Sequence, residues 1–149
     1  MGYGDISKCI EQRNFSPDVR IFSARVTDQN NEYDPDELIE HQLSEALEYF
    51  LENYPSIKVV NISLGDEFAV YKDGAYQFHF AAVIDELAYK YRDNNVVFVI
   101  SSGNYVPDDL EDEEIVTNYP SYLLNSEQAR VIDPATSALA LTVGGLSNG

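Results

Sequence analysis

The sequence predicts an α/β fold, a three-layer structure in which helices flank a parallel β-sheet, and three observations support this class. Short apolar segments rich in β-branched residues alternate along the chain with longer amphipathic segments. Apolar residues in the longer segments have helical spacing, and the short run at residues 96–100 has the continuous apolar character of a strand covered on both faces. Strands that alternate with helices form parallel sheets through right-handed crossovers.

Residues 19–55 contain one predicted strand and one predicted helix. Residues 19–26 alternate apolar and polar positions imperfectly and include β-branched and aromatic residues, which favours a strand. Asp34 is the expected N-cap of the helix, Pro35 its first residue, and Pro55 ends it. The apolar positions of this helix form one stripe: Ile39, Leu43, Ala46, Leu47, Phe50, Leu51 and Tyr54.

The residues after Pro55 continue the alternation and complete a βαβαβ order. Residues 58–64 form a predicted strand that Gly65 closes, residues 96–100 form a continuous apolar strand, and residues 138–143 predict one more buried strand. A second helix is expected between residues 65 and 96. Its predicted buried face consists of Phe80, Ile84, Leu87, Ala88 and Tyr91.

The composition indicates one domain, or part of one, with an acidic surface. A chain of 149 residues with 44% hydrophobic residues can form a core. Its formal charge of −17 repels phosphate backbones and anionic lipids, so we expect neither nucleic acid nor membrane as a partner. Cys9 is the only cysteine, which excludes an internal disulfide, and no stretch approaches the ~18 apolar residues of a membrane span. The sequence specifies no compartment.

Two strand ends carry the residues that favour a functional site. In an open α/β sheet, ligands bind beyond the carboxyl ends of the strands. Residues 61–65 read Asn-Ile-Ser-Leu-Gly after one predicted strand, and residues 101–104 read Ser-Ser-Gly-Asn after the next. We therefore expect the site where these two strands end.

These strand ends resemble two motifs of the subtilisin-like serine peptidases. In that family a strand ends in Asn-x-Ser-Leu-Gly, a helix follows, and an apolar strand then ends in small residues followed by Gly-Asn. The later segments Tyr119-Pro120, Asp133-Pro134-Ala135 and Leu141-Thr-Val-Gly-Gly145 resemble the family's proline-containing loop and a strand ending in Val-Gly. The resemblance covers about residues 19–147. It implies that residues 1–149 are a partial subtilisin-like peptidase domain.

The resemblance implies a role for each strand end. Asn104 would donate its side-chain amide to the oxyanion of the tetrahedral intermediate, because a neutral N–H group in a dry cleft stabilises developing charge. One rim of the cleft, to which an extended peptide would add as a strand, consists of Ser63, Leu64 and Gly65. The opposite wall of the pocket for the residue before the scissile bond consists of Ser101, Ser102 and Gly103. The residues alone also allow a turn role for Asn104 and two ordinary glycine-terminated strand ends.

The catalytic triad of such a peptidase is missing from this sequence. The family takes its Asp, His and Ser from Asp-x-Gly, His-Gly-Thr and Gly-Thr-Ser-x-Ala segments, and none of these occurs here. His41 and His79 are expected to be solvated or capping residues, and Ser137 only imitates the nucleophile motif. Residues 2–5 are expected to be the exit of a helix. We therefore expect an incomplete domain, between the His and Ser segments, that cleaves peptides only together with the remainder of its own domain.

Three alternatives remain open at this stage. The first is a peptide-binding pseudo-peptidase without a triad. The second is a nucleotide-binding or receiver-like domain, which is disfavoured because residues 27–30 after the first strand contain no glycine. The third concerns calcium, since an acidic run could bind Ca²⁺ but lacks a glycine-punctuated loop, so no cofactor is expected. That run consists of Asp108, Asp109, Glu111, Asp112, Glu113 and Glu114.

Overall fold

The computed structural model describes residues 4–17, 19–30, 32–105, 107 and 112–145. Within them the helices are α1 (Ile6–Gln12), α2 (Ile39–Asn53), α3 (His79–Lys90), α4 (Asp112–Asn118) and α5 (Ser121–Asn125), with 3₁₀ turns at Arg92–Asn94 and Glu127–Ala129. The strands are β1 (Val59–Ile62), β2 (Asp66–Val70), β3 (Val97–Ser101), β4 (Ile132–Asp133) and β5 (Leu141–Val143). The X-Pro bonds Tyr119-Pro120 and Asp133-Pro134 are cis.

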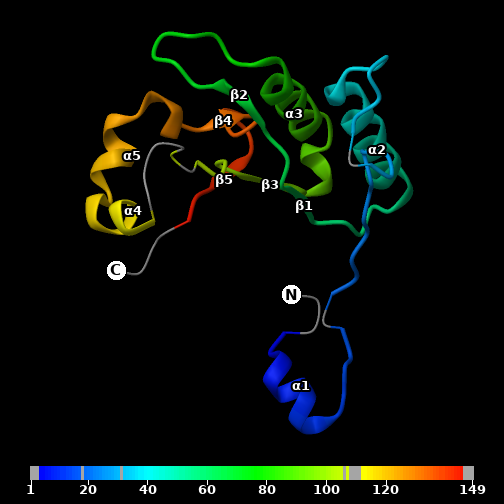
Figure 1. Ribbon diagram of the computed structural model, residues 1–149. Coiled ribbons are helices and arrows are strands. Elements are labelled where there is room, and N and C mark those ends of the chain that lie inside the picture. The colour runs from blue at the N-terminus through cyan, green and yellow to red at the C-terminus, as the bar shows by residue number, and fades with distance from the viewer. Residues whose placement is uncertain (1–3, 18, 31, 106, 108–111, 146–149) are drawn as a thin grey trace.

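A parallel sheet of three strands in the order β1-β3-β5 forms the centre of the structure (Figure 1). Val60 of β1 lies opposite Phe98 of β3, and Ile100 of β3 lies opposite Thr142 of β5. Helix α3 lies in the connection between β1 and β3, as a parallel crossover requires. The predicted α/β class, with a parallel sheet and flanking helices, is confirmed.

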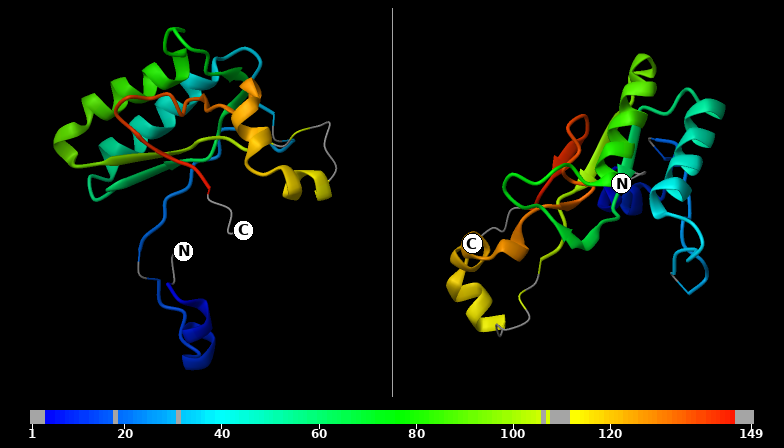
Figure 2. Two further views of the ribbon diagram at one scale, coloured as in Figure 1. Left: turned by 90° about the vertical axis from the view of Figure 1, so that its left-hand side faces the viewer. Right: turned by 90° about the horizontal axis from the view of Figure 1, so that it is seen from above.

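The hydrophobic core lies between this sheet and helices α2 and α3, which pack together on one face of it (Figure 2). Residues on β1 alternate, so that Val60 and Ile62 are buried while Val59 and Asn61 are exposed. The buried core residues of the two helices and two central strands are Leu43, Leu47, Leu51, Phe80, Ile84, Leu87, Val60, Ile62, Phe98 and Ile100. The face of the sheet away from α2 and α3 carries exposed apolar side chains, namely Val59, Val97, Leu141 and Val143.

Residues 19–26 are extended but form no strand, so this prediction was wrong. A cleft of about 1360 Å³ lies between residues 19–27 and β1, with apolar residues of α2 in its wall. Phe22 packs on the aromatic rings of Phe50 and Tyr54 instead, at centroid distances of 5.9 and 4.6 Å. β-branched residues favour extended backbone, but a strand also needs a hydrogen-bonded neighbour. The described residues provide none here.

Helix α2 begins later than predicted, with Leu38 rather than Asp34 as its N-cap. A side-chain oxygen of Asp34 accepts a hydrogen bond from the N–H of Asp36 (3.0 Å), and its carbonyl accepts one from the N–H of Glu37 (3.3 Å). Asp and Pro favour such turns as strongly as they favour helix starts. The predicted end before Pro55 is correct, since α2 ends at Asn53.

Several elements were not predicted, and one prediction needs correction. β2 pairs antiparallel with β4, which has only two residues, and β5 is shorter than the predicted strand at 138–143. Asp5 caps α1 by accepting a hydrogen bond from the N–H of Lys8 (3.3 Å). Asp5 therefore begins a helix rather than ending one, and residues 2–3 of the expected helix exit lie outside the described residues.

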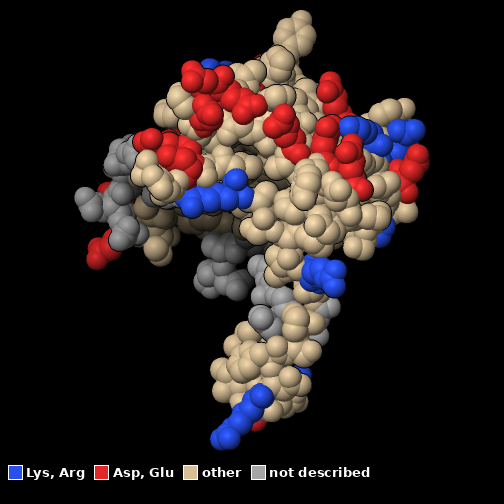
Figure 3. Space-filling model, turned by 90° about the vertical axis from the view of Figure 1, so that its right-hand side faces the viewer, with Lys and Arg blue, Asp and Glu red and all other residues tan. Residues whose placement is uncertain are grey.

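Acidic side chains are spread over the upper part of the face seen in Figure 3, with few basic side chains among them. One basic residue, Lys90 of α3, pairs with Glu48 of α2 at 2.7 Å. This face of the molecule is therefore acidic and open to solvent. Among the described residues, no helix is both long enough and apolar enough to cross a membrane.

We expect Ile84→Ala to lower the free energy of unfolding by about 2–5 kcal/mol, because it removes methyl groups at a position with 0% exposure. Glu86→Ala, at an exposed position of the same helix, is the matched control and should change stability by less than about 0.5 kcal/mol. Urea unfolding followed by circular dichroism measures both. Equal midpoints for the two variants would contradict the position of α3 in the core.

Candidate functional site

The candidate site lies where β1 and β3 end, side by side at one edge of the sheet (Figure 1). Ile62 and Ile100 are opposite each other in the register, so Gly65 and Gly103 follow the two strands at equivalent positions. After β1, Ser63 and Gly65 are exposed and Leu64 packs against the core. The structure thus brings the two predicted sets of residues together on neighbouring strands.

The backbone after β3 is held from both sides. The N–H of Ser102 donates to the carbonyl of Val143 at 3.0 Å, and the carbonyl of Ser102 accepts from the N–H of Ile132 at 3.3 Å. Gly103 has a φ of 112°, a conformation that residues with a Cβ atom rarely adopt. Ser101, Ser102 and Gly103 are half-buried, so the chain reaches the surface only at the next residue.

Asn104 is the first exposed residue after this fixed backbone. Its amide is therefore accessible to a bound molecule. On the neighbouring strand end, the Asn61 amide donates to the Ser63 hydroxyl at 2.9 Å, and the backbone of residues 63–65 lies beyond the hydrogen-bonded ladder of β1. Chemically, the strand ends offer neutral donors to an anionic oxygen and an unpaired backbone to an extended peptide.

Asp133 caps helix α3 from a distant part of the chain. Its two carboxylate oxygens accept from the N–H groups of Phe80 (3.3 Å) and Ala81 (2.9 Å), in the first turn of a helix whose own N-cap residue forms no side-chain cap. The Asp133 side chain is buried, with 6% exposure for the residue. Burial raises the pKa of Asp133 above its ordinary value, and the two hydrogen bonds only partly offset this effect.

Asp85 of α3 holds the loop that leads into β5. Its oxygens accept from the N–H groups of Ala138 (3.0 Å) and Leu139 (2.8 Å), from the Ser137 hydroxyl at 2.5 Å, and from the Gln77 amide at 2.6 Å. Burial alone would raise the pKa of Asp85, but these hydrogen bonds together lower it below its ordinary value. Ser137 is buried in this network, which agrees with its expected non-catalytic role.

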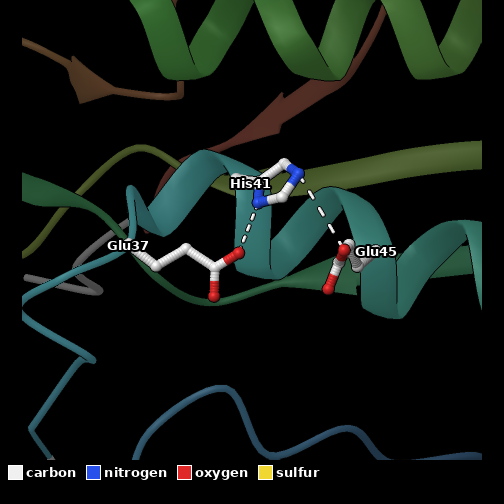
Figure 4. A group of neighbouring side chains, drawn as sticks. All are labelled: Glu37, His41 and Glu45. Atoms are coloured by element: carbon white, nitrogen blue, oxygen red, sulfur yellow. Dashed lines mark hydrogen bonds and ion pairs between the residues drawn. The ribbon is translucent and has the colours of Figure 1, made fainter.

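Neither histidine belongs to the candidate site. His79 is the exposed first residue of α3. His41 lies on the exposed side of α2, where one ring nitrogen contacts Glu37 and the other lies 3.9 Å from Glu45 (Figure 4). The hydrogen bond to Glu37, followed by the charges of Glu37 and Glu45, raises the pKa of His41. Both histidines thus have the solvated positions expected of them.

Glu37, His41 and Glu45 are also the group in the described residues whose ligand atoms lie close enough for a metal ion. All three side chains are exposed, and the two carboxylates contact different ring nitrogens. A protonated imidazole satisfies both carboxylates without a metal. Of the acidic run considered for calcium, residues 108–111 lie outside the described residues and Asp112 begins α4, so the structure does not test that possibility.

Two carboxylates and one apolar residue of this region were missed by the sequence analysis, namely Asp85, Asp133 and Ile132. The carboxylates act on backbone groups about fifty residues away in sequence. Asp85 interrupts the apolar stripe of α3, which is ordinary for a helix surface. Only Asp133, directly before a proline that resembles a family motif, had a local signal.

Comparisons with known proteins identify a family for this chain. Residues 3–149 match the model of the Subtilase family. An uncharacterized protein of Sinorhizobium fredii is 38% identical over 109 residues, which are 72% of this chain and 24% of that protein. The matched part thus spans about a quarter of the relative's length. No solved structure matches the chain.

We expect Asp85→Asn to lower the free energy of unfolding at pH 7 by about 1–3 kcal/mol, because an amide cannot accept all the hydrogen bonds of the carboxylate. Glu86→Gln, its exposed neighbour, is the control. The folded state lowers the pKa of Asp85, so the stabilisation is present above pH 3.8 and is lost as the pH falls below it. Urea unfolding at several pH values should show that the free energies of unfolding of wild type and Asp85→Asn become similar in acid. A difference that does not change with pH would contradict the role of the carboxylate.

Gly103→Ala is expected to destabilise the chain by about 2–4 kcal/mol, since its φ is strained for alanine and a Cβ atom would lie 3.0 Å from Ile132. Gly74→Ala is the matched control. Gly74 also has a positive φ, 76°, but its Cβ would meet no atom within 4 Å, so we expect a loss of about 1 kcal/mol. Thermal unfolding compares the two variants. Equal losses of stability would show that the contact with Ile132 does not contribute to the effect of Gly103→Ala.

Proposed function

The chain belongs to the subtilase family, and we propose that it supplies the oxyanion donor and the peptide-binding strand ends of a serine endopeptidase domain. The observation that carries this proposal is the position of Asn104. It is exposed directly after a backbone that β4 and β5 fix from both sides, beside the strand end at residues 63–65. A preorganised donor needs such a fixed backbone, because the donor then pays no reorganisation cost as charge develops.

Peptide hydrolysis by such a domain proceeds through an acyl-enzyme. A serine hydroxyl attacks the scissile carbonyl, a histidine takes its proton, and the carbonyl oxygen becomes negative in the tetrahedral intermediate. The Asn104 amide would donate a hydrogen bond to that oxygen. Because the amide is neutral and does not titrate, its contribution is independent of pH over the range in which the histidine works.

The triad itself would come from the remainder of the peptidase domain. His41 is held between two glutamates, His79 is exposed at the start of α3, and the Ser137 hydroxyl donates to Asp85 rather than to a histidine. The isolated chain should therefore be inert towards peptides. The substrate would be a peptide or protein whose extended backbone pairs with residues 63–65.

A peptide-binding pseudo-peptidase is the alternative function. It is favoured by one observation, that the Ser137 hydroxyl donates to the carboxylate of Asp85 and not to a histidine. The complete protein distinguishes the two proposals. A His-Gly-Thr segment before this chain and a Gly-Thr-Ser segment after it would exclude the alternative.

We expect Asn104→Ala in the full-length protein to lower kcat for casein by about 10²–10³, with little change in KM; this size is the one known for such a donor in a subtilisin and is not obtained from the present structure. Asn118→Ala, at an exposed position in α4, is the matched control and should keep full activity. Release of acid-soluble fragments from casein gives the rates.

Each outcome of this experiment has a separate meaning. Equal kcat for wild type and Asn104→Ala would remove Asn104 from the mechanism. A full-length protein that cleaves no casein but binds peptides would favour the pseudo-peptidase. Cleavage by the isolated 149-residue chain would contradict a triad supplied from outside it.

A further inference from the structure

We propose that Ile132 fills the pocket between the two strand ends, so that the peptidase cleaves after small apolar residues such as alanine. The inference rests on the proposed function, because it names the substrate class of that same site. It starts from a contact that the sequence did not reveal. One branched side chain from β4 touches the glycines of both neighbouring strand ends.

The contact is tight on both sides. A Cβ atom added to Gly65 would lie 2.7 Å from Cδ1 and 3.2 Å from Cγ1 of Ile132. A Cβ atom added to Gly103 would lie 3.0 Å from each of the same two atoms. Both distances are shorter than carbon atoms approach without strain. The isoleucine side chain therefore occupies the space that the two glycines leave open.

The backbone of Ile132 cannot easily move, because it is held on several sides. Its N–H donates to the carbonyl of Ser102 at 3.3 Å, and in β4 it lies opposite Val70 of β2. The preceding carbonyl, of Val131, accepts from the N–H of Tyr71 at 3.0 Å. The following residue, Asp133, is buried as the cap of α3. Movement of Ile132 would therefore break the cap or the strand pairing.

The Ile132 side chain is half-buried, so part of its surface stays open to a ligand at the strand ends. In the proposed function, the substrate residue before the scissile bond lies between residues 63–65 and residues 101–103. A methyl group can contact the exposed part of the isoleucine there. A leucine or phenylalanine would need the volume that Cγ1 and Cδ1 already fill, and a lysine would bury its charge against hydrocarbon.

The size of the expected preference between substrate side chains can be estimated from other close-fitting apolar pockets. One added methylene group in a close-fitting apolar pocket changes kcat/KM by about 10–200-fold. Leucine exceeds alanine by three carbon atoms, so at least a tenfold preference for alanine is expected on this scale. Shortening Ile132 should relax the preference without removing the oxyanion donor, which lies on the β3 side of the site.

The experiment uses the full-length protein as wild type, Ile132→Ala and Ile132→Val. Casein and three peptides that differ only in the residue before the scissile bond (alanine, leucine or phenylalanine) are the substrates. Wild type should show kcat/KM for the alanine peptide at least about tenfold above the other two. In Ile132→Ala, the ratio of the leucine and phenylalanine values to the alanine value should rise at least about tenfold, and Ile132→Val should give a ratio between those of wild type and Ile132→Ala.

The outcomes separate this inference from the function on which it rests. Cleavage of casein by a wild type that prefers leucine or phenylalanine overturns the inference and leaves the peptidase in place. An equal loss for all three peptides in Ile132→Ala makes the residue structural and also overturns it. A wild type that cleaves neither casein nor peptides overturns the proposed function itself. If Ile132→Ala fails to fold, the relative kcat/KM values of the three peptides for wild type and Ile132→Val still test the inference.

Discussion

The attachment of helix α3 to the segment between β4 and β5 is the interaction on which the rest of the structure depends. Two carboxylates form this attachment. Asp133 of the segment caps the first turn of the helix, and Asp85 of the helix binds the loop before β5. The helix has no side-chain cap of its own, and the loop N–H groups of Ala138 and Leu139 donate to Asp85. Each element therefore satisfies the backbone of the other, and β5 is placed beside β3 as a result.

The geometry of the candidate site follows from this attachment. Because Asp133 is fixed under α3, the preceding Ile132 crosses the strand ends and binds the carbonyl of Ser102. Any side chain at Gly65 or Gly103 would collide with it, so the close approach requires glycine at both positions. The glycines that suggested a substrate cleft in the sequence thus also have a packing role. These two roles are compatible, since the same contact that fixes Gly103 also fixes the start of Asn104.

The parts of the fold that the sequence predicted are those with local signals. β1, β3, α2 and α3 have clear apolar patterns in the sequence, and both glycine-terminated strand ends follow β1 and β3 as expected. The missed features depend on partners far along the chain: the pairing of β2 with β4, the cap from Asp133, and the contact of Ile132 with two glycines. Residues 19–26 show the converse, because their local pattern is right for a strand but β1 does not pair with them. Local pattern thus located the site, but it did not reveal what fills the site.

The charge of −17 poses a physical problem for a site that stabilises a negative oxygen. Acidic groups repel an oxyanion, but exposed charges more than about 8 Å away are largely screened at physiological ionic strength. Asp66 and Glu67 directly follow Gly65, but both residues are exposed to water, which weakens their effect on an oxyanion. A hydrogen bond acts at about 3 Å and is not screened by salt at that distance. A neutral amide in direct contact therefore acts more strongly on the oxyanion than solvent-exposed carboxylates do, which is how oxyanion stabilisation and strong overall acidity can occur in the same chain.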